Sequence, residues 1–474
     1  MLTEVPGLEV RGDLAGLVVT GCTHDSRAVR PGDLYAALPG AHTHGAAFGA
    51  QAMGSGAVAV LTDPAGAEQL VGVPLLVAPS PRAVLGEISS WVHGHPSAAL
   101  TVLGVTGTNG KTTTAFLLEA GLRAAGLLTG LLGTVLTRIG ADEVKSERTT
   151  PEATDLHALF AVMRERGVTS VAMEVSSHAL SLGRVDGVRF DTAVFTNLSQ
   201  DHLDFHPTME DYFAAKASLF SPSRSMRGLI NADDPSGRRL LSSPTIPMAS
   251  YGEAADWRAE EVELRAEGSR FVLRGPGVSA PASVRLPGEF NVRNALAALA
   301  CLVIAGVPLE AAVVGIAGLA GVPGRMERID EGQAFTALVD YAHTPAAVET
   351  LLRAVREVTS GRVIVVLGCG GDRDKGKRPL MGRAAVDGAD IAVLTSDNPR
   401  SEDPLAILAA MQQPGAVIEP DRQAAIGWAV AHAQPGDTVV VAGKGHESGQ
   451  EIAGVITPFD DRQVLREVLQ AVVA

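Results

Sequence analysis

The sequence predicts an α/β protein built on parallel sheets and divided into three domains. Short apolar runs alternate with helix-like segments almost throughout, which is typical of parallel sheets covered by helices. The 474 residues leave room for about three domains of ~150 residues each. Apolar side chains make up 46% of the chain, enough for a core in each domain.

Two glycine- and proline-bearing segments suggest the domain boundaries. His93-Gly94-His95-Pro96 has the composition of a linker, which gives a first domain of residues 1–98. Val322-Pro323-Gly324-Arg325 closes a second domain of residues 99–325. Residues 326–474 then form the third.

The second domain opens with the pattern of a phosphate-binding loop. Leu100–Val105 is predicted to be a buried strand, and a helix should begin at Lys111. Between them Gly107–Thr113 supplies glycines that let backbone N–H groups approach phosphate oxygens at a helix N-terminus. Lys111 would contact the β- and γ-phosphates and the Thr112 hydroxyl a magnesium ion. The glycine spacing is shorter than usual, yet the context predicts a central sheet of the P-loop ATPase type.

Three further residues of this domain are candidates for the chemistry. Glu174 ends the predicted strand 170–174, and His202 follows the strand 192–196. Magnesium prefers oxygen ligands, so Glu174 suits it, whereas histidine is an unusual ligand. Lys216 lies among apolar neighbours in a helical pattern, and burial would favour the neutral amine that reacts with carbon dioxide to give a carbamate. Each of the three is also compatible with a structural role.

The third domain has three predicted strands that lead into polar, glycine- or proline-bearing loops. The strands are 362–367, 391–395 and 438–442, and the loops are 368–373, 396–400 and 443–447. Ligands of open α/β sheets bind beyond the carboxyl ends of strands, so the loops should converge on one site. The charge run 372–378 is either part of that site or solvated surface, and Cys369 is expected to be a packing residue.

Composition excludes several classes of function. The net charge of −14 argues against nucleic-acid and anionic-membrane binding. Cys22, Cys301 and Cys369 form no CxxC pair and no H-E-x-x-H is present, so neither a zinc site nor a disulfide framework is indicated. Residues 1–6 lack a signal-peptide pattern, and the apolar stretch 301–322 is interrupted at Pro308. We therefore expect a cytoplasmic protein without membrane insertion.

Several ordered motifs together resemble those of the Mur ligases of peptidoglycan synthesis, over nearly the whole chain. Within that family the sequence is similar to the enzymes that add the third residue of the stem peptide. The resemblance implies an N-terminal UDP-substrate-binding domain, a central ATP-binding domain and a C-terminal Rossmann-like domain for the incoming amino acid. The motifs are Asp25-Ser26-Arg27, Gly107–Thr113, Thr149-Thr150-Pro151-Glu152, Met173–His178, Asp201-His202-Leu203-Asp204, Gly324–Glu327, Asp340-Tyr341-Ala342-His343, Asp397–Arg400 and Gly443–Glu447.

The resemblance also implies roles for individual residues, with ATP and Mg²⁺ as cofactors. Catalytic roles fall on Lys111, Glu174, His202 and Lys216, and the metal ligands are Thr112, Glu174, His202 and the carbamate of a modified Lys216. ATP contacts fall on Gly107, Thr108, Asn109, Gly110, Lys111, Thr112, Thr113, Asn294, Arg325 and Asp340, with His343 nearby. UDP-substrate contacts fall on Ser26, Thr149, Thr150, Ser176 and Arg184. Amino-acid contacts fall on Arg373, Asp397, Asn398, Pro399, Arg400, Gly443 and Glu447.

The implied reaction joins meso-diaminopimelate to UDP-MurNAc-L-Ala-D-Glu through an acyl phosphate. Arg400 can pair with the second carboxylate of diaminopimelate, which L-lysine and L-ornithine lack. These two amino acids stay open as alternatives. Leu182 departs from the family where some relatives carry glutamine, so one polar contact to the UDP substrate is in doubt. A monomer is expected.

Two rival interpretations remain. A nucleotide-driven switch or motor would use the same phosphate loop, but no Asn-Lys-x-Asp sequence is present and the three loops of the last domain would have no role. A ligase of the folylpolyglutamate synthase type would share the central fold. Such enzymes lack a UDP-binding first domain, so residues 1–98 count against that interpretation.

Overall fold

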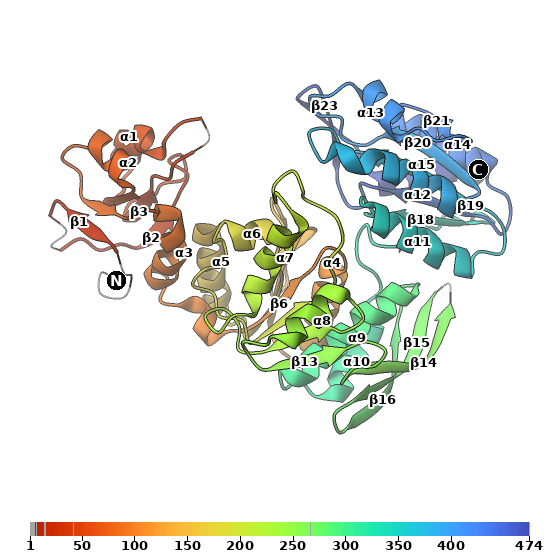
Figure 1. The fold of residues 1–474 in the computed structure, drawn as a ribbon, viewed down its shortest axis with the longest axis horizontal. Helices are drawn as coiled ribbons and strands as arrows, with labels where there is room; N and C mark the ends of the chain where they lie inside the picture. Colours follow the sequence, from red (N-terminus) through yellow and green to blue (C-terminus); the bar gives the residue numbers. More distant parts are fainter. Residues whose placement is uncertain (1–4, 6, 14–15, 41, 266, 474) are drawn as a thin grey trace.

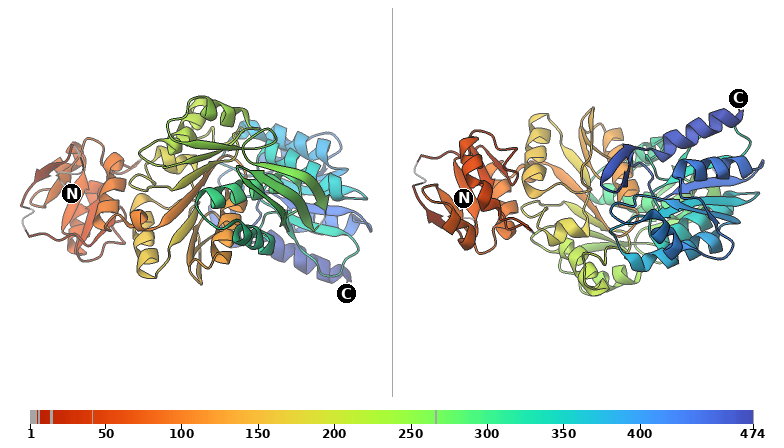
Figure 2. Two further views of the ribbon diagram at one scale, coloured as in Figure 1. Left: turned by 90° about the horizontal axis from the view of Figure 1, so that it is seen from below. Right: turned by 90° about the horizontal axis from the view of Figure 1, so that it is seen from above.

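The computed structural model describes residues 5, 7–13, 16–40, 42–265 and 267–473, and residues 1–4 and 6 of the N-terminal segment lie outside this description. Three sheets, each with its own helices, follow one another along the chain (Figure 1). The N-terminal sheet stands at one end of the molecule, and the two views of Figure 2 place the C-terminal part at the other. No helix among the described residues is long and apolar enough to cross a membrane.

The N-terminal part is a five-stranded sheet in the order β1-β5-β4-β3-β2. Only the edge pair β1–β5 is antiparallel. Leu85 and Ile88 of α3 pack on one face, and Ala52 and Ala67 of α1 and α2 on the other. The elements are β1 (Glu9–Arg11), β2 (Gly21–Thr23), β3 (Asp33–Ala36), η1 (Gly45–Phe48), α1 (Gly49–Gly54), β4 (Ala59–Thr62), α2 (Pro64–Gln69), β5 (Leu75–Val77) and α3 (Pro81–Val92), followed by η2 (Pro96–Ala99).

The central part is an eight-stranded sheet in the order β13-β12-β11-β6-β10-β7-β8-β9. The strands from β13 to β7 are parallel, and β8 and β9 extend the sheet as an antiparallel hairpin. The predicted strands are confirmed, since 170–174 is β10 and the neighbouring runs are β6 and β11. The strands are β6 (Thr101–Thr106), β7 (Thr129–Leu132), β8 (Leu136–Ile139), β9 (Asp142–Lys145), β10 (Ser170–Glu174), β11 (Thr192–Phe195), β12 (Gly228–Asn231) and β13 (Met248–Tyr251).

Helices cover both faces of this sheet because its strands are apolar on both sides. Leu103 and Val105 of β6 face α4, α9 and α10, whereas Val102 of the same strand faces the helices α5 to α8. The helices are α4 (Lys111–Ala124), α5 (Ala153–Glu165), α6 (Ser177–Ser181), α7 (Met209–Ala217) with η3 (Ser218–Phe220), α8 (Pro235–Ser242), α9 (Glu289–Ile304) and α10 (Leu309–Gly318).

A three-stranded antiparallel sheet, which the sequence analysis did not predict, is attached to this part. It consists of β14 (Arg258–Arg265), β15 (Gly268–Gly275) and β16 (Val278–Val284). Phe271 and Leu273 of β15 pack with α9 and α10 in one core. The sheet therefore packs against α9 and α10 and supports these helices.

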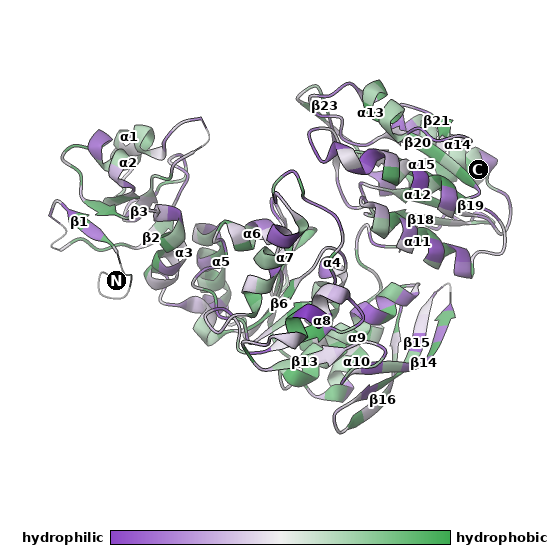
Figure 3. Cartoon of the chain, viewed as in Figure 1, coloured by the Kyte–Doolittle hydropathy of each residue, from purple (hydrophilic) through white to green (hydrophobic). Residues whose placement is uncertain are grey.

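The C-terminal part is a six-stranded sheet in the order β17-β18-β22-β19-β20-β21, parallel except at β17. The three strands predicted here are β19, β20 and β22, and they are adjacent in the sheet. Their buried apolar residues belong to the two cores of this part, and Figure 3 shows the apolar colour on the strand labelled β20. The elements are β17 (Glu327–Arg328), β18 (Thr336–Asp340), α11 (Pro345–Val358), β19 (Val363–Cys369), η4 (Lys375–Lys377), α12 (Arg378–Gly388), β20 (Ile391–Ser396), α13 (Pro404–Met411), β21 (Val417–Ile418), α14 (Arg422–His432), β22 (Thr438–Ala442), β23 (Gly449–Ile452), β24 (Val455–Pro458) and α15 (Asp461–Val473).

A buried histidine of α5 makes the stability of this fold dependent on pH. His157 is fully buried, and its ring contacts the Asp186 carbonyl at 2.9 Å through Nε2. Burial lowers the pKa of His157 from 6.5 to about 4. The unfolded chain therefore binds a proton on His157 more tightly than the folded chain does. The stability that neutral His157 contributes to the folded state is complete above about pH 6.5 and is lost as the pH falls from about 6.5 to 4. The shift corresponds to about 3 kcal/mol.

We expect His157→Gln to reduce the loss of stability on acidification, because glutamine cannot be protonated. The measurement is the urea midpoint of unfolding at pH 7.5 and pH 4.5, compared between variant and wild type. His432→Gln provides the matched control, because it makes the same substitution at an exposed histidine. An equal loss in the His157→Gln protein and the wild type would contradict this assignment.

Candidate active site

The phosphate loop lies between β6 and α4, as the sequence predicts, and neighbouring backbone holds it. Gly107 and Gly110 have φ angles of 148° and 87°, in the region that favours glycine. A Cβ atom on Gly107 would lie 1.9 Å from the Thr196 hydroxyl oxygen, so no other residue fits there. Thr108 and Asn109 donate their backbone N–H groups to Asn197, at 2.8 and 2.9 Å. The loop is thus fixed to the segment that follows β11.

Two lysines converge on the same carbonyl of this loop. Lys111 Nζ donates to the carbonyls of Gly107 and Thr108, both at 2.9 Å, and Lys216 Nζ donates to that of Gly107 at 2.7 Å. Lys216 is 1% exposed at the end of α7, beside the Tyr212 ring. Burial first, and the positive charge of Lys111 second, hold the pKa of Lys216 well below its usual range. The structure therefore favours a neutral Lys216 amine.

Glu174 is held rigidly at the carboxyl end of β10. Its carboxylate accepts a bond from the Thr134 backbone N–H at 2.7 Å and from the Thr134 hydroxyl at 3.1 Å. The Thr112 hydroxyl donates to the same carboxylate at 3.0 Å. Glu174 is only 1% exposed. Its hydrogen bond to Thr112 connects its carboxylate to the first turn of α4.

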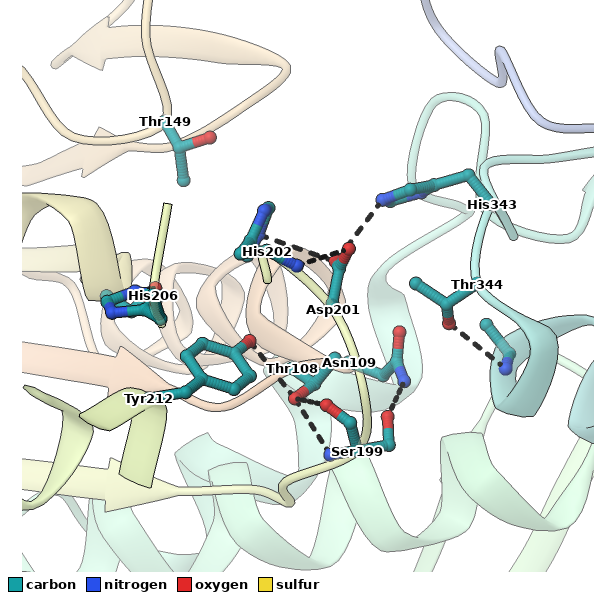
Figure 4. A network of polar contacts seen from close by, with 12 residues as sticks. Thr108, Asn109, Thr149, Ser199, Asp201, His202, His206, Tyr212, His343 and Thr344 are labelled. Atoms are coloured by element: carbon teal, nitrogen blue, oxygen red, sulfur yellow. Dashed lines mark hydrogen bonds and ion pairs between the residues drawn. The ribbon is translucent and has the colours of Figure 1, made fainter. Parts of the chain in front are cut away.

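His202 and Asp201 form the link to the C-terminal part of the chain (Figure 4). His202 Nε2 lies 3.4 Å from the Asp201 carboxylate, and His343 Nε2 approaches it to 3.7 Å from the other side. Burial lowers the pKa of His202 to about 3, so its imidazole is neutral. Burial raises the pKa of Asp201, but the hydrogen bond from His343 and the nearby charge of Lys377 outweigh this and hold it below its usual range. Asp201 is therefore an anion shared by the two domains.

The residues predicted to contact ATP surround the loop. Arg325 donates to the Thr112 hydroxyl at 3.0 Å, and its guanidinium lies 4.4 Å from the centre of the Tyr341 ring. The Asp340 carboxylate accepts the backbone N–H groups of Met326 and Ala342 at 2.7 and 2.8 Å. Asn294 of α9 lies against Gly110, where a Cβ atom would be 2.6 Å from its side-chain oxygen.

One cavity of about 790 Å³ contains most of the predicted residues. Thr149, Thr150, Ser176 and Arg184, predicted for the UDP substrate, line it together with the phosphate loop, Glu174 and His202. Of the residues predicted for the amino acid, Arg373 lines the cavity and the others do not. Ser26 is buried in the N-terminal part and does not line it either.

The three predicted loops of the C-terminal domain do converge. Asn398 donates to the Glu447 carboxylate at 2.8 Å, which joins the loop after β20 to the loop after β22. Arg400 donates to the Gly371 carbonyl at 2.7 Å, which joins the loop after β19. Gly443 lies beside Asp397, where a Cβ atom would be 2.8 Å from a carboxylate oxygen.

The charge run 372–378 is solvated surface over most of its length, since Asp372, Arg373, Lys375 and Gly376 are exposed, and only its last two residues are buried. Arg378 is 4% exposed and bonds to the Glu402 carboxylate at 2.8 Å, and Lys377 is also buried. Cys369 is buried among the apolar residues of α11 to α13, as expected for a packing residue.

The predicted metal ligands form no ready-made cluster. Among the described residues, no group of three or more His, Cys, Asp or Glu side chains is placed to hold a metal ion. Thr112 and Glu174 are hydrogen-bonded, and they supply the hydroxyl and carboxylate oxygens that Mg²⁺ prefers. His202 lines the same cavity, while Lys216 in its amine form bonds to a carbonyl. These residues fit a magnesium ion that takes further oxygens from phosphates or from a carbamate.

Sequence reasoning missed Thr134. It bonds to Glu174 through both backbone and side chain, and its hydroxyl lies 3.0 Å from that of Thr149. The signal that could have found it is its position, because Thr134 lies two residues after the end of β7, at the carboxyl edge of the sheet where ligands of open α/β sheets bind.

The fold and this cavity define a P-loop enzyme with three domains, and comparison with known proteins gives its family. Residues 105–302 match the Mur ligase middle domain, residues 324–445 the Mur ligase glutamate ligase domain, and residues 18–91 the Mur ligase family catalytic domain. The UDP-N-acetylmuramoyl-L-alanyl-D-glutamate--2,6-diaminopimelate ligase of Streptomyces coelicolor is 60% identical, over 95% of this chain and 92% of its own. The chain belongs to the Mur ligase family.

Solved structures agree. A structure of a UDP-N-acetylmuramoyl-L-alanyl-D-glutamate--2,6-diaminopimelate ligase has a TM-score of 0.68 and 35% identity, with 96% of each chain covered. Folylpolyglutamate synthase from Mycobacterium tuberculosis shares the fold, with a TM-score of 0.63 and 20% identity, over 76% of this chain and 92% of its own.

Proposed function

We propose that this protein is the ATP-dependent ligase that adds meso-diaminopimelate to the D-Glu of UDP-MurNAc-L-Ala-D-Glu in peptidoglycan synthesis. The observation that carries the proposal is the single cavity shared by the phosphate loop, the hydroxyl-rich residues predicted for the UDP substrate, and Arg373 of the C-terminal domain. The name of the relative that is 60% identical supports the choice of substrates.

In the first step the γ-carboxylate of D-Glu attacks the γ-phosphoryl group of ATP. The bond from phosphorus to the bridging oxygen breaks, and the products are an acyl phosphate and ADP. Lys111 at the start of α4 and the loop N–H groups hold the phosphates and stabilise charge on the transferring group. Thr149, Thr150, Ser176 and Arg184 orient the carboxylate.

Thr112, Glu174, His202 and the carbamate of Lys216 would hold magnesium, which supplies positive charge beside the transferring phosphoryl group. Glu174 cannot turn away from that position, because Thr134 and Thr112 hold its carboxylate. Among the proposed ATP contacts, Asn294 lies on α9, Arg325 ends the central domain and Asp340 ends β18 of the C-terminal domain, so nucleotide binding would join the two domains.

In the second step the amine of the incoming amino acid attacks the activated carbonyl, loses a proton, and expels phosphate. Asp397, Asn398, Arg400, Gly443 and Glu447 would hold this amino acid on loops outside the ATP cavity, and Arg373 would lie between the two. The C-terminal domain must therefore move its loops toward the cavity, which also excludes the water that would hydrolyse the acyl phosphate.

The rival functions fit less well. The folylpolyglutamate synthase structure matches only 76% of this chain, and the N-terminal five-stranded sheet would have no role in such an enzyme. A switch or motor leaves the converging loops of the C-terminal domain unexplained. We also propose domain boundaries at 98/99 and 325/326, which fall between the three sheets, and a monomer in the cytoplasm, where ATP and nucleotide-linked precursors are found.

The test of the function is phosphate release from ATP and UDP-MurNAc-L-Ala-D-Glu, measured with meso-diaminopimelate, L-lysine or L-ornithine. We expect release to depend on the amino acid and to be fastest with meso-diaminopimelate. Thermal-shift binding of the UDP substrate against a folate separates the two ligase types. A preference for L-lysine or L-ornithine would disprove the proposed amino acid, and release independent of any amino acid would favour a switch.

Arg400 is expected to determine the choice of amino acid. Its side chain is 24% exposed, and its guanidinium is anchored by Gly371 and lies 3.7 Å from Glu451. The far carboxylate of meso-diaminopimelate would form an ion pair with the Arg400 guanidinium, whereas L-lysine has no carboxylate at that end. Loss of a buried charge partner costs ~3–5 kcal/mol, and the lower end of this range applies because Arg400 is partly exposed. Arg400→Ala should therefore reduce the preference for meso-diaminopimelate over L-lysine by roughly a hundredfold.

The measurement is kcat/KM for each amino acid in the variant and the wild type. The exposed Arg383 of α12 provides a matched control, because Arg383→Ala removes an arginine of the same domain outside the proposed site. An undiminished preference in Arg400→Ala would show that another group recognises the far carboxylate.

A further inference from the structure

A fully buried lysine lies directly behind the proposed amino-acid site. Lys444 follows β22 in the loop 443–447, and its side chain is 0% exposed. Its ammonium donates to the Asn398 side-chain oxygen at 3.0 Å, to Glu447 Oε2 at 3.2 Å and to the Gly449 carbonyl at 2.8 Å. All three donor positions of the ammonium are therefore used, and two of the partners are residues proposed to hold the amino acid.

These bonds determine which way the Asn398 amide faces. Its oxygen accepts both the Lys444 ammonium and the Glu451 backbone N–H at 3.1 Å. Its nitrogen must then point the opposite way, where it donates to Glu447 Oε2 at 2.8 Å. A flipped amide would place its N–H groups against two other donors, so the network allows one orientation only.

The same network leaves one carboxylate oxygen of Glu447 for a ligand. Lys444 and Asn398 both bond to Oε2, and no described residue donates a hydrogen bond to Oε1. The Glu447 side chain is 33% exposed, which leaves room for a ligand at this carboxylate. A carboxylate whose one oxygen is fixed and whose other accepts no bond from the described residues is suited to bind the ammonium of an incoming amino acid.

We propose that Lys444 is a positioning residue for the amino-acid substrate, because it locks Asn398 and Glu447 into one preformed acceptor for a substrate ammonium group. This inference rests on the proposed function of the loops as an amino-acid site. None of the three hydrogen-bond partners of Lys444 belongs to the phosphate loop or lines the ATP cavity. The effect of Lys444 therefore falls on the second step alone.

A purely structural role for Lys444 predicts a different result. If the ammonium only stabilised the loop, its loss would lower stability and affect both steps together. If it merely competed with the substrate for Glu447, its loss would strengthen amino-acid binding. Preorganisation instead predicts weaker binding of the amino acid with an intact first step.

The experiment compares wild type with Lys444→Met, which keeps the length and apolar stem of the side chain. We expect the KM for meso-diaminopimelate to rise roughly 10–100-fold, by analogy with the loss seen when a group that orients metal ligands is removed. The KM for ATP and the rate of acyl-phosphate formation, trapped with hydroxylamine without any amino acid, should stay unchanged. The exposed Lys375, paired with Glu402 at 3.2 Å, provides the control as Lys375→Met.

A double-mutant cycle tests whether Lys444 acts through its partner. Glu447→Gln alone should raise the same KM, and Lys444→Met should add little to it in the double variant, because both changes disrupt one unit. If Lys444→Met does not fold, Lys444→Gln replaces it. Glutamine can still donate to Asn398 or Gly449 but cannot serve all three acceptors, so the KM should rise in the same direction by a smaller factor.

The outcomes separate this inference from the proposed function. A wild-type protein whose phosphate release does not depend on any amino acid would overturn the function itself. A wild type that ligates, combined with an unchanged or lower KM in the Lys444 variant, would overturn the inference alone. Fully additive effects in the cycle, or equal loss of both steps, would also show that Lys444 does not position Glu447.

Discussion

Replacing Lys216 with alanine is expected to abolish ligation. The Lys216 side chain is 1% exposed, and its Nζ lies 2.7 Å from the Gly107 carbonyl, within the loop that would hold the phosphates. A neutral amine there can add carbon dioxide, which forms a nitrogen–carbon bond, releases a proton and leaves a carbamate anion. The two carbamate oxygens would join the Thr112 hydroxyl and the Glu174 carboxylate as ligands of the magnesium ion.

Two measurements test the carbamate. Short carboxylic acids such as formate or acetate should partly restore Lys216→Ala, because they replace the missing oxygens. Wild-type protein equilibrated with ¹³C-labelled carbon dioxide should show a carbamate resonance that the variant lacks. Lys216→Arg, which keeps a positive charge but cannot form a carbamate, should be inactive. Normal activity of Lys216→Ala at ordinary magnesium concentration would rule the modification out.

Replacing Lys111 with alanine should lower acyl-phosphate formation by at least ~10²–10³-fold, the usual cost of removing one positioned charge from such a site. The loss should be larger if Lys111 also positions the phosphates, since its ammonium bonds directly to the loop carbonyls of Gly107 and Thr108. Hydroxylamine trapping measures this step without the amino acid.

Binding of the UDP substrate should survive the same substitution. Thr150, Ser176 and Arg184 keep their positions through bonds that do not involve Lys111, such as the 3.1 Å bond from the Ser176 N–H to the Thr150 hydroxyl. Calorimetric titration with UDP-MurNAc-L-Ala-D-Glu checks this, and Lys375→Ala again provides the lysine control. Unchanged turnover in Lys111→Ala would refute the assignment of the phosphate loop.

Local pattern was enough to predict the strands and the phosphate loop. The runs that became β10 and β22 are short apolar segments bounded by polar residues, and such segments are typical of the central strands of a parallel sheet. Gly107 and Gly110 have positive φ angles, and a side chain at either position would collide with Thr196 or Asn294. The family resemblance added the roles that single residues such as Lys216 do not reveal.

The sequence did not predict the antiparallel sheet β14–β16. The strand β14 is rich in charged residues, and β15 and β16 are interrupted by glycine, serine, arginine or proline, so the three strands lack the continuous apolar signal of the central strands. Their pairing depends on packing of Phe271 and Leu273 against α9 and α10, which is a tertiary effect.

The fold class, the phosphate loop and the convergence of the three C-terminal loops could be predicted from the amino-acid sequence, because they follow from short-range patterns and from the edge that parallel strands share. Which oxygens and nitrogens meet depends on the folded structure. Thr134 holds Glu174 across two strands, Asp201 is shared between domains, and Lys444 is buried behind Glu447. Burial and hydrogen-bond geometry depend on residues far apart in the chain, and these long-range contacts give each ordinary side chain its charge state and its direction.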